Sequence, residues 1–350
     1  MKDLPPVVSD HVADNEPASF LRTSASDYLV RFIASRLPNP GQPLAEAAAY
    51  HFTKTGKMLR AKMALRAASL LSVDQAAALH WAVAVEVMHN ASLVHDDICD
   101  GDQFRRGRPS VYAKYGSNVA LALGDWMIAL SFELAAEAAQ RSQAPVLVKI
   151  LASHMKITTL GEACEFDIQR VCSWYDYLQI SADKTAPLLT APLEGVLNMG
   201  LHGGMMTSIG AYFRCLGNAY QIANDILNFM GDDGAEATGS DLRRRGPNAV
   251  TVLYREILDG PIKADFESWY ESGCNVDLEA WQSRIIKSSA MHVAAQKMLK
   301  MLRESEELAA AQPAELVEVI KPVQQMLQQI CEKPAAALAP HLVVSSYDAK

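Results

Sequence analysis

The sequence has 350 residues, half of them hydrophobic, so the chain is long enough to bury a substantial core. Its formal net charge of −8 excludes a surface built to bind nucleic acid, because an acidic protein repels phosphates. No uninterrupted apolar run reaches the roughly 18 to 20 residues that span a bilayer, and the first residues lack the order of a secretory signal. The six cysteines form no CxxC pair, which fits a reducing compartment. We therefore predict a cytoplasmic protein without stable membrane insertion.

The order of predicted elements begins with a flexible leader, because residues 1–25 mix Pro, Asp, Glu and Ser with few large apolar residues. Residues 336–350 are predicted to be a loose tail. Between them, apolar residues recur at helical spacing and alternating strand patterns are absent, so we predict a single all-α domain over 26–335. Helices are expected at 26–36, 41–52, 57–71, 74–99, 117–139, 144–160, 174–190, 205–229 and 248–258, with several more from 265 to 332.

Two of these helices, 74–99 and 205–229, are long and apolar on most sides, which predicts central positions in the domain. The first ends in Asp96, Asp97 and Asp100. On a helix, Asp96 and Asp100 share a face and Asp97 lies beside them. The C-terminal end of a helix disfavours anions, and this helix contains no Lys or Arg. A cation is therefore expected at these carboxylates.

A basic loop, Arg105-Arg106-Gly107-Arg108-Pro109, directly follows this acidic cluster. A DDxxD run by itself is also typical of a solvated helix end. Here the loop favours another interpretation, because the guanidinium fork suits phosphate and Mg²⁺ binds carboxylate, phosphate and water oxygens. The combination predicts a site for a magnesium-bound diphosphate.

The second long helix ends in Asn224, Asp225 and Asn228, followed by Asp232 and Asp233. If the helix persists, Asn224, Asn228 and Asp232 share one face and could form a second metal site. An Asn/Asp helix end near a glycine is equally an ordinary C-terminal stop. The sequence leaves both interpretations open.

Other basic residues would help to neutralise two diphosphates. Lys57 and Arg60 are three apart at a predicted helix start, and Lys184 follows in the segment SADKTAPLL. The run Arg243 to Arg245 comes after the second cluster. Each of these elements alone is also explained as ordinary surface charge.

The segments GKMLR, EVMHNASLVHDDICDGDQFRRGRPS, KTA, YQIANDILN and GSDLRRR occur in an order that resembles the trans-isoprenyl diphosphate synthases, across about residues 45–255. This family includes the farnesyl and geranylgeranyl diphosphate synthases. The resemblance implies a bundle of long antiparallel helices around a central apolar cavity, the isoprenoid synthase fold, usually as a homodimer. It also implies that an allylic prenyl diphosphate is condensed with isopentenyl diphosphate. The implied cofactor is Mg²⁺, two or three ions per site, with Mn²⁺ as the alternative ion.

The resemblance also assigns roles to individual residues. The catalytic set would be Asp96, Asp97, Asp100 and Lys184. The metal would be coordinated by Asp96, Asp100, Asn224 and Asp225. The allylic diphosphate would be bound by Arg105, Lys184, Thr185 and Gln221. Isopentenyl diphosphate would be bound by Lys57, Arg60, His89 and Arg106.

The second cluster departs from the family, which usually carries DDxxD where this chain has Asn224 and Asn228. An amide oxygen binds Mg²⁺ more weakly than a carboxylate does. The pattern NDxxNxxxD also has the spacing of class I terpene synthases, so cyclisation, or prenyl transfer to another acceptor, is an alternative. A non-catalytic modulatory subunit of a synthase is a third. The complete isopentenyl diphosphate set favours elongation.

Product length depends on the residues above the first cluster. In the resembling family this helix lines the cavity, and Ala91 and Ser92 are small, whereas Met88 could form a floor one turn deeper. This pattern predicts geranylgeranyl diphosphate, a C20 product. The alternative is that Met88 and Ala91 only pack against a neighbouring helix.

Overall fold

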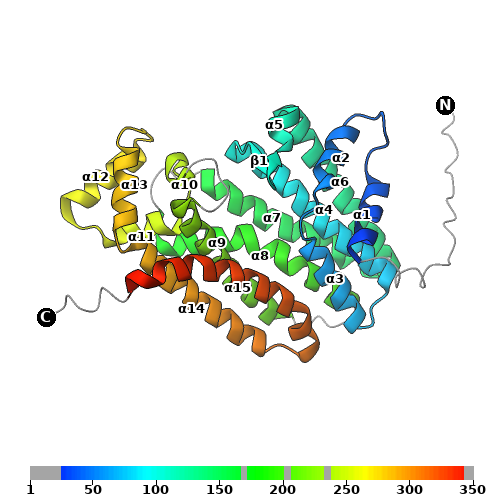
Figure 1. The fold of residues 1–350 in the computed structure, drawn as a ribbon. Coiled ribbons are helices and arrows are strands. Elements are labelled where there is room, and N and C mark those ends of the chain that lie inside the picture. Colours follow the sequence, from blue (N-terminus) through cyan, green and yellow to red (C-terminus); the bar gives the residue numbers. More distant parts are fainter. Residues whose placement is uncertain (1–24, 167–171, 201–205, 232–237, 343–350) are drawn as a thin grey trace.

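The computed structural model describes residues 25–166, 172–200, 206–231 and 238–342 (Figure 1). The predicted leader 1–25 therefore lies almost wholly outside the described residues. Within the described ranges, nearly every element is a helix, which confirms the all-α class. The exception in these ranges is a two-stranded hairpin of β1 (Phe104–Arg105) and β2 (Arg108–Pro109).

The first half of the fold centres on one buried helix. After α1 (Ala25–Arg36), α2 (Ala45–Thr53) and α3 (Leu59–Leu70), α4 spans Gln75–Asp100. Asp74 caps α4 by accepting a hydrogen bond from the backbone N–H of Ala77 at 2.7 Å. Gly101, with a φ of 70°, ends α4 in the left-handed conformation that glycine adopts readily. These caps fix where the acidic end of α4 lies.

Helix α6 (Ser117–Ser142) packs along α4 and follows the short α5 (Val111–Tyr115). By length and composition, α6 is apolar enough to cross a membrane, and it is the one such helix in the described part of the chain. In the fold, 44% of its most apolar window is buried, and a core helix of a soluble protein passes the same test. One such helix is therefore weak evidence for a membrane span.

Three further long helices complete the central bundle, namely α7 (Val146–Phe166), α8 (Trp174–Met199) and α9 (Met206–Met230). Helix α8 was predicted to stop at 190, but it continues through Pro187 and Pro192. Both prolines are buried, so packing compensates for the hydrogen bonds that proline removes. Trp81 of α4 packs where α8 has Gly195.

The remaining helices flank this bundle, with α14 and α15 lying alongside α9 (Figure 1). They are α10 (Ser240–Arg244), α11 (Ala249–Ile257), α12 (Gly260–Glu271), α13 (Leu278–Lys287), α14 (Ala290–Ala310) and α15 (Ala314–Leu342). Helix α15 continues past the predicted domain end at 335 to Leu342, and it buries Leu338. Residues 343–350 of the predicted tail lie outside the described residues.

Candidate active site

Two cavities meet beside the acidic end of α4. A polar cavity of about 590 Å³ is lined by residues of α3, α4, α7, α8, α9 and α15. An apolar cavity of about 340 Å³ lies between α4, α6 and α7. Both cavities are bordered by Ser92, Asp96, Thr158, Glu162 and Leu188. A molecule with a charged head and an apolar tail could occupy both at once.

The three acids at the end of α4 face three environments. Asp96 lines both cavities, and burial, reinforced by the charge of Glu162, raises the pKa of its carboxyl to about 7. Asp97 is 1% exposed and accepts from Arg105 at 2.7 Å (Nε to Oδ1) and 2.6 Å (Nη2 to Oδ1). Asp100 instead meets Arg244. Asp97 therefore positions the basic hairpin, while Asp96 alone of the three reaches the cavities.

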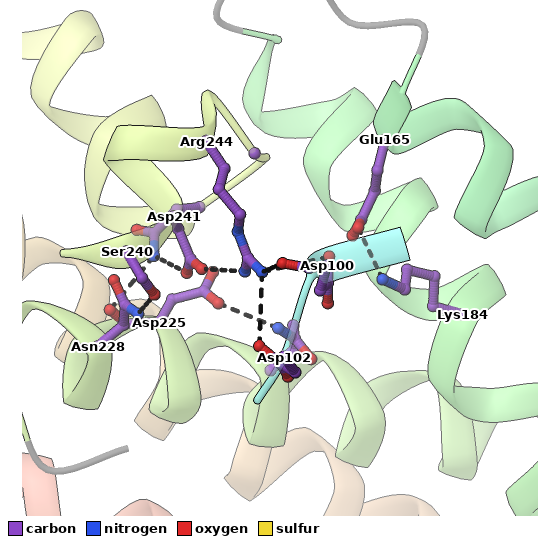
Figure 2. Close-up of polar contacts among 12 residues, drawn as sticks. Asp100, Asp102, Glu165, Lys184, Asp225, Asn228, Ser240, Asp241 and Arg244 are labelled. Atoms are coloured by element: carbon purple, nitrogen blue, oxygen red, sulfur yellow. Dashed lines mark hydrogen bonds and ion pairs between the residues drawn. The ribbon is translucent and has the colours of Figure 1, made fainter. Parts of the chain in front are cut away.

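Lys184 on α8 is held by two glutamates of α7 that the sequence analysis missed. Its Nζ lies 2.8 Å from Oε2 of Glu162 and 2.7 Å from Oε2 of Glu165 (Figure 2 shows the second contact). Burial alone would lower the pKa of Lys184, but Glu165 and Glu162 raise it, so it stays protonated. Burial raises the pKa of Glu165 to about 7. Within the described part of the chain, Oε1 of Glu162 is buried without a hydrogen-bond partner.

The residues predicted to bind isopentenyl diphosphate all lie on the wall of the polar cavity: Lys57, Arg60, His89 and Arg106. Nε of Arg60 donates to the carbonyl of Leu188 at 3.0 Å. This carbonyl lacks its usual helical donor because residue 192 is a proline without an N–H. The proline in α8 thus frees the acceptor that orients Arg60.

His89 and Arg106 complete this wall. Burial, with added repulsion from Arg60 and Arg106, holds the pKa of His89 well below its usual value, so the ring is neutral at neutral pH. Arg106 donates to Oδ1 of Asn90 at 3.3 Å and to the carbonyl of Lys54. A Cβ added at Gly56, where φ is 69°, would lie 3.2 Å from the Arg106 guanidinium carbon. Glycine at 56 therefore leaves room for this arginine.

All four residues predicted for the allylic diphosphate line the same cavity: Arg105, Lys184, Thr185 and Gln221. Arg105 is nevertheless bound to Asp97, as described above. It also lies 3.5 Å from Asp102, measured from Nη2 to Oδ2. The structure brings the two predicted diphosphate sets into one cavity, from helices distant in sequence.

The second cluster divides into one cavity residue and two structural ones. Asn224 lines the polar cavity. Asp225 is 2% exposed, and its oxygens accept from the Tyr177 hydroxyl (2.7 Å), the Ala249 N–H (2.7 Å) and the Gln221 amide (3.0 Å). Burial and the nearby charge of Asp241 raise the pKa of Asp225. The predicted role of Asp225 as a metal ligand does not fit this geometry, because its donors come from α8, α9 and α11 and join them.

Asn228 and the run Arg243 to Arg245 lie next to the contacts by which Asp225 links α8, α9 and α11. The amide of Asn228 donates to the hydroxyl of Ser240 at 2.8 Å. Arg244 reaches the acids: it lies 3.3 Å from Asp100 (Nη1 to Oδ1) and 3.0 Å from Asp241 (Nη2 to Oδ1), as Figure 2 shows. Arg245 instead stacks over the Trp269 ring at 3.9 Å. The candidate ligands Asp232 and Asp233 lie outside the described residues.

Comparisons with known proteins decide the family. A sequence profile described as polyprenyl synthetase matches residues 41–277, which is more than half of the chain. The chain belongs to the polyprenyl synthetase family. It is 34% identical over 219 residues to a geranylgeranyl diphosphate synthase of Saccharolobus solfataricus, which covers 60% of this chain and 65% of that protein. It is also 34% identical over 232 residues to heptaprenyl diphosphate synthase component 2 of Geobacillus stearothermophilus, covering 63% and 69%.

Solved structures agree on the fold. The geranylgeranyl pyrophosphate synthetase of Pyrococcus horikoshii Ot3 superposes with a TM-score of 0.73 at 24% identity, over 88% of this chain and 96% of that one. The predicted resemblance and the helical bundle of this polyprenyl synthetase are therefore confirmed. The predicted class, a prenyltransferase that lengthens a prenyl diphosphate, is confirmed at the level of the family.

The residues of this polyprenyl synthetase fit the divalent cation that its family implies. Mg²⁺ needs only one or two carboxylates when substrate phosphates complete its shell, and Asp96 and Asp100 share one face of α4. Burial, reinforced by the charge of Glu162, raises the pKa of Asp96, and a bound cation would favour its charged form. The buried Oε1 of Glu162, which has no hydrogen-bond partner among the described residues, belongs to a side chain on the same wall. Among the described residues, no three His, Cys, Asp or Glu side chains converge on a single metal position. Phosphate oxygens would therefore supply part of the coordination.

The residues predicted to set chain length are only partly on the cavity wall. Met88 and Ser92, one turn apart, line the apolar cavity. Ala91 is fully buried and is absent from both cavity walls, because on the helix it is turned from the face that carries Met88 and Ser92. Ile128 of α6 and Met155 of α7 complete this part of the wall, and the sequence analysis missed both.

Proposed function

We propose that this polyprenyl synthetase condenses an allylic prenyl diphosphate with isopentenyl diphosphate, in the presence of Mg²⁺, to give geranylgeranyl diphosphate. One observation carries the proposal. The polar cavity that holds the cationic side chains lies directly beside the apolar cavity between α4, α6 and α7, and Asp96 and Ser92 line both. The two diphosphates would bind in the first cavity, and the growing hydrocarbon would extend into the second.

The cationic residues divide the work of binding. Lys184, oriented by Glu162 and Glu165, would hold the allylic diphosphate near Asp96. Arg60 and Arg106 would hold isopentenyl diphosphate with their guanidinium forks. Bound magnesium would supply positive charge to the leaving diphosphate. The apolar wall would exclude water from the allylic cation, which water would otherwise quench.

The bond changes follow from this arrangement. The bond between C1 and oxygen of the allylic substrate breaks, and its electron pair leaves with the diphosphate. The double bond of isopentenyl diphosphate then donates its electron pair to C1, which forms the new carbon–carbon bond. A proton is lost from the resulting cation to the released pyrophosphate. Positive groups around the diphosphate favour the first step because negative charge develops there.

The test is product analysis with purified protein, Mg²⁺ and dimethylallyl, geranyl or farnesyl diphosphate, with and without isopentenyl diphosphate. A C20 diphosphate formed only when isopentenyl diphosphate is present is the expected result. Asp96→Ala serves as the inactive control, because it removes the carboxylate at the junction of the cavities. A hydrocarbon or alcohol formed without isopentenyl diphosphate would instead support cyclisation, which Asn224 and Asn228 favour. A chain inactive alone but active on a partner synthase would support the modulatory role.

We further propose that the protein is a cytoplasmic homodimer, as the family resemblance implies. Light scattering coupled to gel filtration would measure the mass of the particle in solution. Twice the 38.2 kDa chain mass is expected. A particle of single-chain mass would contradict the dimer.

A further inference from the structure

We propose that Arg244 is a positioning residue that neutralises the acids of the metal-free site and moves to the diphosphate when a metal ion takes Asp100. This role rests on the proposed function, since it assumes that a metal-bound diphosphate occupies the cavity. It assigns a task to one of three adjacent arginines.

The contacts of Arg244 link two parts of the site (Figure 2). Its Nη1 lies 3.3 Å from Oδ1 of Asp100 and 3.9 Å from Oδ1 of Asp102, both at the end of α4. Its Nη2 lies 3.0 Å from Oδ1 of Asp241 within α10. One guanidinium thus occupies the place between the acids where a metal ion would also be attracted.

The two ends of this bridge differ in how firmly they are held. Asp241 accepts a second hydrogen bond from the amide of Asn248 at 2.9 Å, which fixes its carboxylate. At the α4 end, Nη1 also donates to the backbone carbonyl of Asp100 at 3.3 Å, but the Asp100 side chain is 28% exposed and has no second hydrogen bond that fixes its carboxylate among the described residues. Arg244 can therefore keep its Nη2 contact to Asp241 while Nη1 exchanges Asp100 for a phosphate oxygen.

The charge of the site explains why such an arginine is useful. On the α9 side, the polar cavity is lined by the amide of Asn224, which attracts a cation less strongly than a carboxylate does. Arg244 supplies positive charge from within the chain at that side. Its neighbours do not: Arg243, which is exposed like Arg244, forms no ion pair with any described residue, and Arg245 donates to the carbonyls of Tyr270 and Cys274.

The experiment measures two affinities that should change in opposite directions in Arg244→Gln. The probes are Mn²⁺ alone, followed by electron paramagnetic resonance, and inorganic pyrophosphate at saturating Mn²⁺, followed by calorimetry. Without its competitor at Asp100, Mn²⁺ alone is expected to bind about threefold or more tightly. Pyrophosphate is expected to bind about tenfold more weakly, because a charge-assisted hydrogen bond is lost.

Matched variants separate this role from a structural one. Arg243→Gln removes an exposed neighbouring charge and should leave both affinities unchanged, whereas Arg244→Lys keeps the charge and should fall between wild type and Arg244→Gln. Unfolding midpoints check that each variant folds. Affinities that fall together in Arg244→Gln, or that both stay unchanged, would overturn the proposal. Wild-type protein that binds both probes but fails to elongate would contradict the proposed function and leave the role of Arg244 standing.

Discussion

At the scale of single residues, burial decides what each acid at the end of α4 can do. Asp97 is enclosed and paired with Arg105, so it holds the hairpin in place. Asp96 is adjacent in sequence but faces the cavities, where Lys184 and Arg105 only partly offset its burial and the charge of Glu162. Asp97 is therefore a positioning residue, and the neighbouring Asp96 is the residue placed to bind a cation.

The pKa of Asp96 makes stability depend on pH. Burial raises this pKa to about 7 in the folded protein, above the value of an unfolded chain. The fold thus favours the protonated form, and its stabilising effect is lost as the pH rises through 7. We predict that metal-free Asp96→Asn matches wild type below about pH 4, the unfolded pKa, and becomes more stable than wild type as the pH rises to 7 and above, by on the order of a few kcal/mol.

Thermal unfolding in the presence of a chelator would check this dependence. Adding Mg²⁺ at pH 8 should stabilise wild type more than Asp96→Asn, because the variant lacks the carboxylate. Equal stability of the two metal-free proteins across the whole pH range would contradict the assigned cause.

At the scale of elements, the packing of α4 against α8 sets the position of the site. Trp81 is fully buried, and its indole N–H donates to the carbonyl of Pro192 at 3.2 Å. A Cβ on Gly195 would lie 2.0 Å from the Trp81 ring. Gly195 is needed because the Trp81 ring lies so close to its backbone, and its φ is not in the left-handed region.

The space around each glycine predicts opposite effects on stability for alanine substitutions at Gly195 and Gly210. Gly195→Ala must displace Trp81 and should destabilise the fold by on the order of 3 kcal/mol. Gly210→Ala on α9 meets nothing within 4 Å and should stabilise it by about 0.5 to 1 kcal/mol, because alanine favours helices. Denaturant unfolding of both variants measures the difference. Equal effects would show that ring packing at Gly195 is unimportant.

The helices themselves were largely predictable, since their apolar residues recur at helical spacing and caps such as Asp74 are local signals. The end of α8 was not, because Pro192 is an ordinary stop signal that only buried packing overrides. The glutamates that hold Lys184 were missed for a related reason. On α7 alone, Glu162 and Glu165 look like solvated surface charges, and only the contact with α8 gives them a role.

At the scale of the whole molecule, the site is assembled from segments far apart in sequence. Motif order identified which residues lie around the polar cavity, including Lys57, His89 and Lys184. Motif order could not show that Asp225 lies away from the cavity wall, because the three donors that enclose its carboxylate come from three different helices. Cavity shape depends even more on long-range packing, since residues of α4, α6 and α7 together close the apolar cavity.

That shape leads to a prediction about product length. Met88 is 2% exposed and lines the apolar cavity with Ile128 and Met155, so Met88→Ala should deepen it and lengthen the product by at least one isoprene unit. Ser92 lies at the junction of the cavities, and Ser92→Phe should block the tail and shorten the product.

Chromatography of the dephosphorylated products would measure chain length for both variants, with unfolding midpoints to show that each is folded. Ser92→Ala is the matched control, because it changes polarity at the junction without filling it. Both predictions follow from one path, in which hydrocarbon passes Ser92 and ends at Met88. If Ser92→Phe shortened the product while Met88→Ala left it unchanged, the path would be right but its floor would lie elsewhere on the wall, at Ile128 or Met155. An unchanged product from both folded variants would place the hydrocarbon outside this cavity.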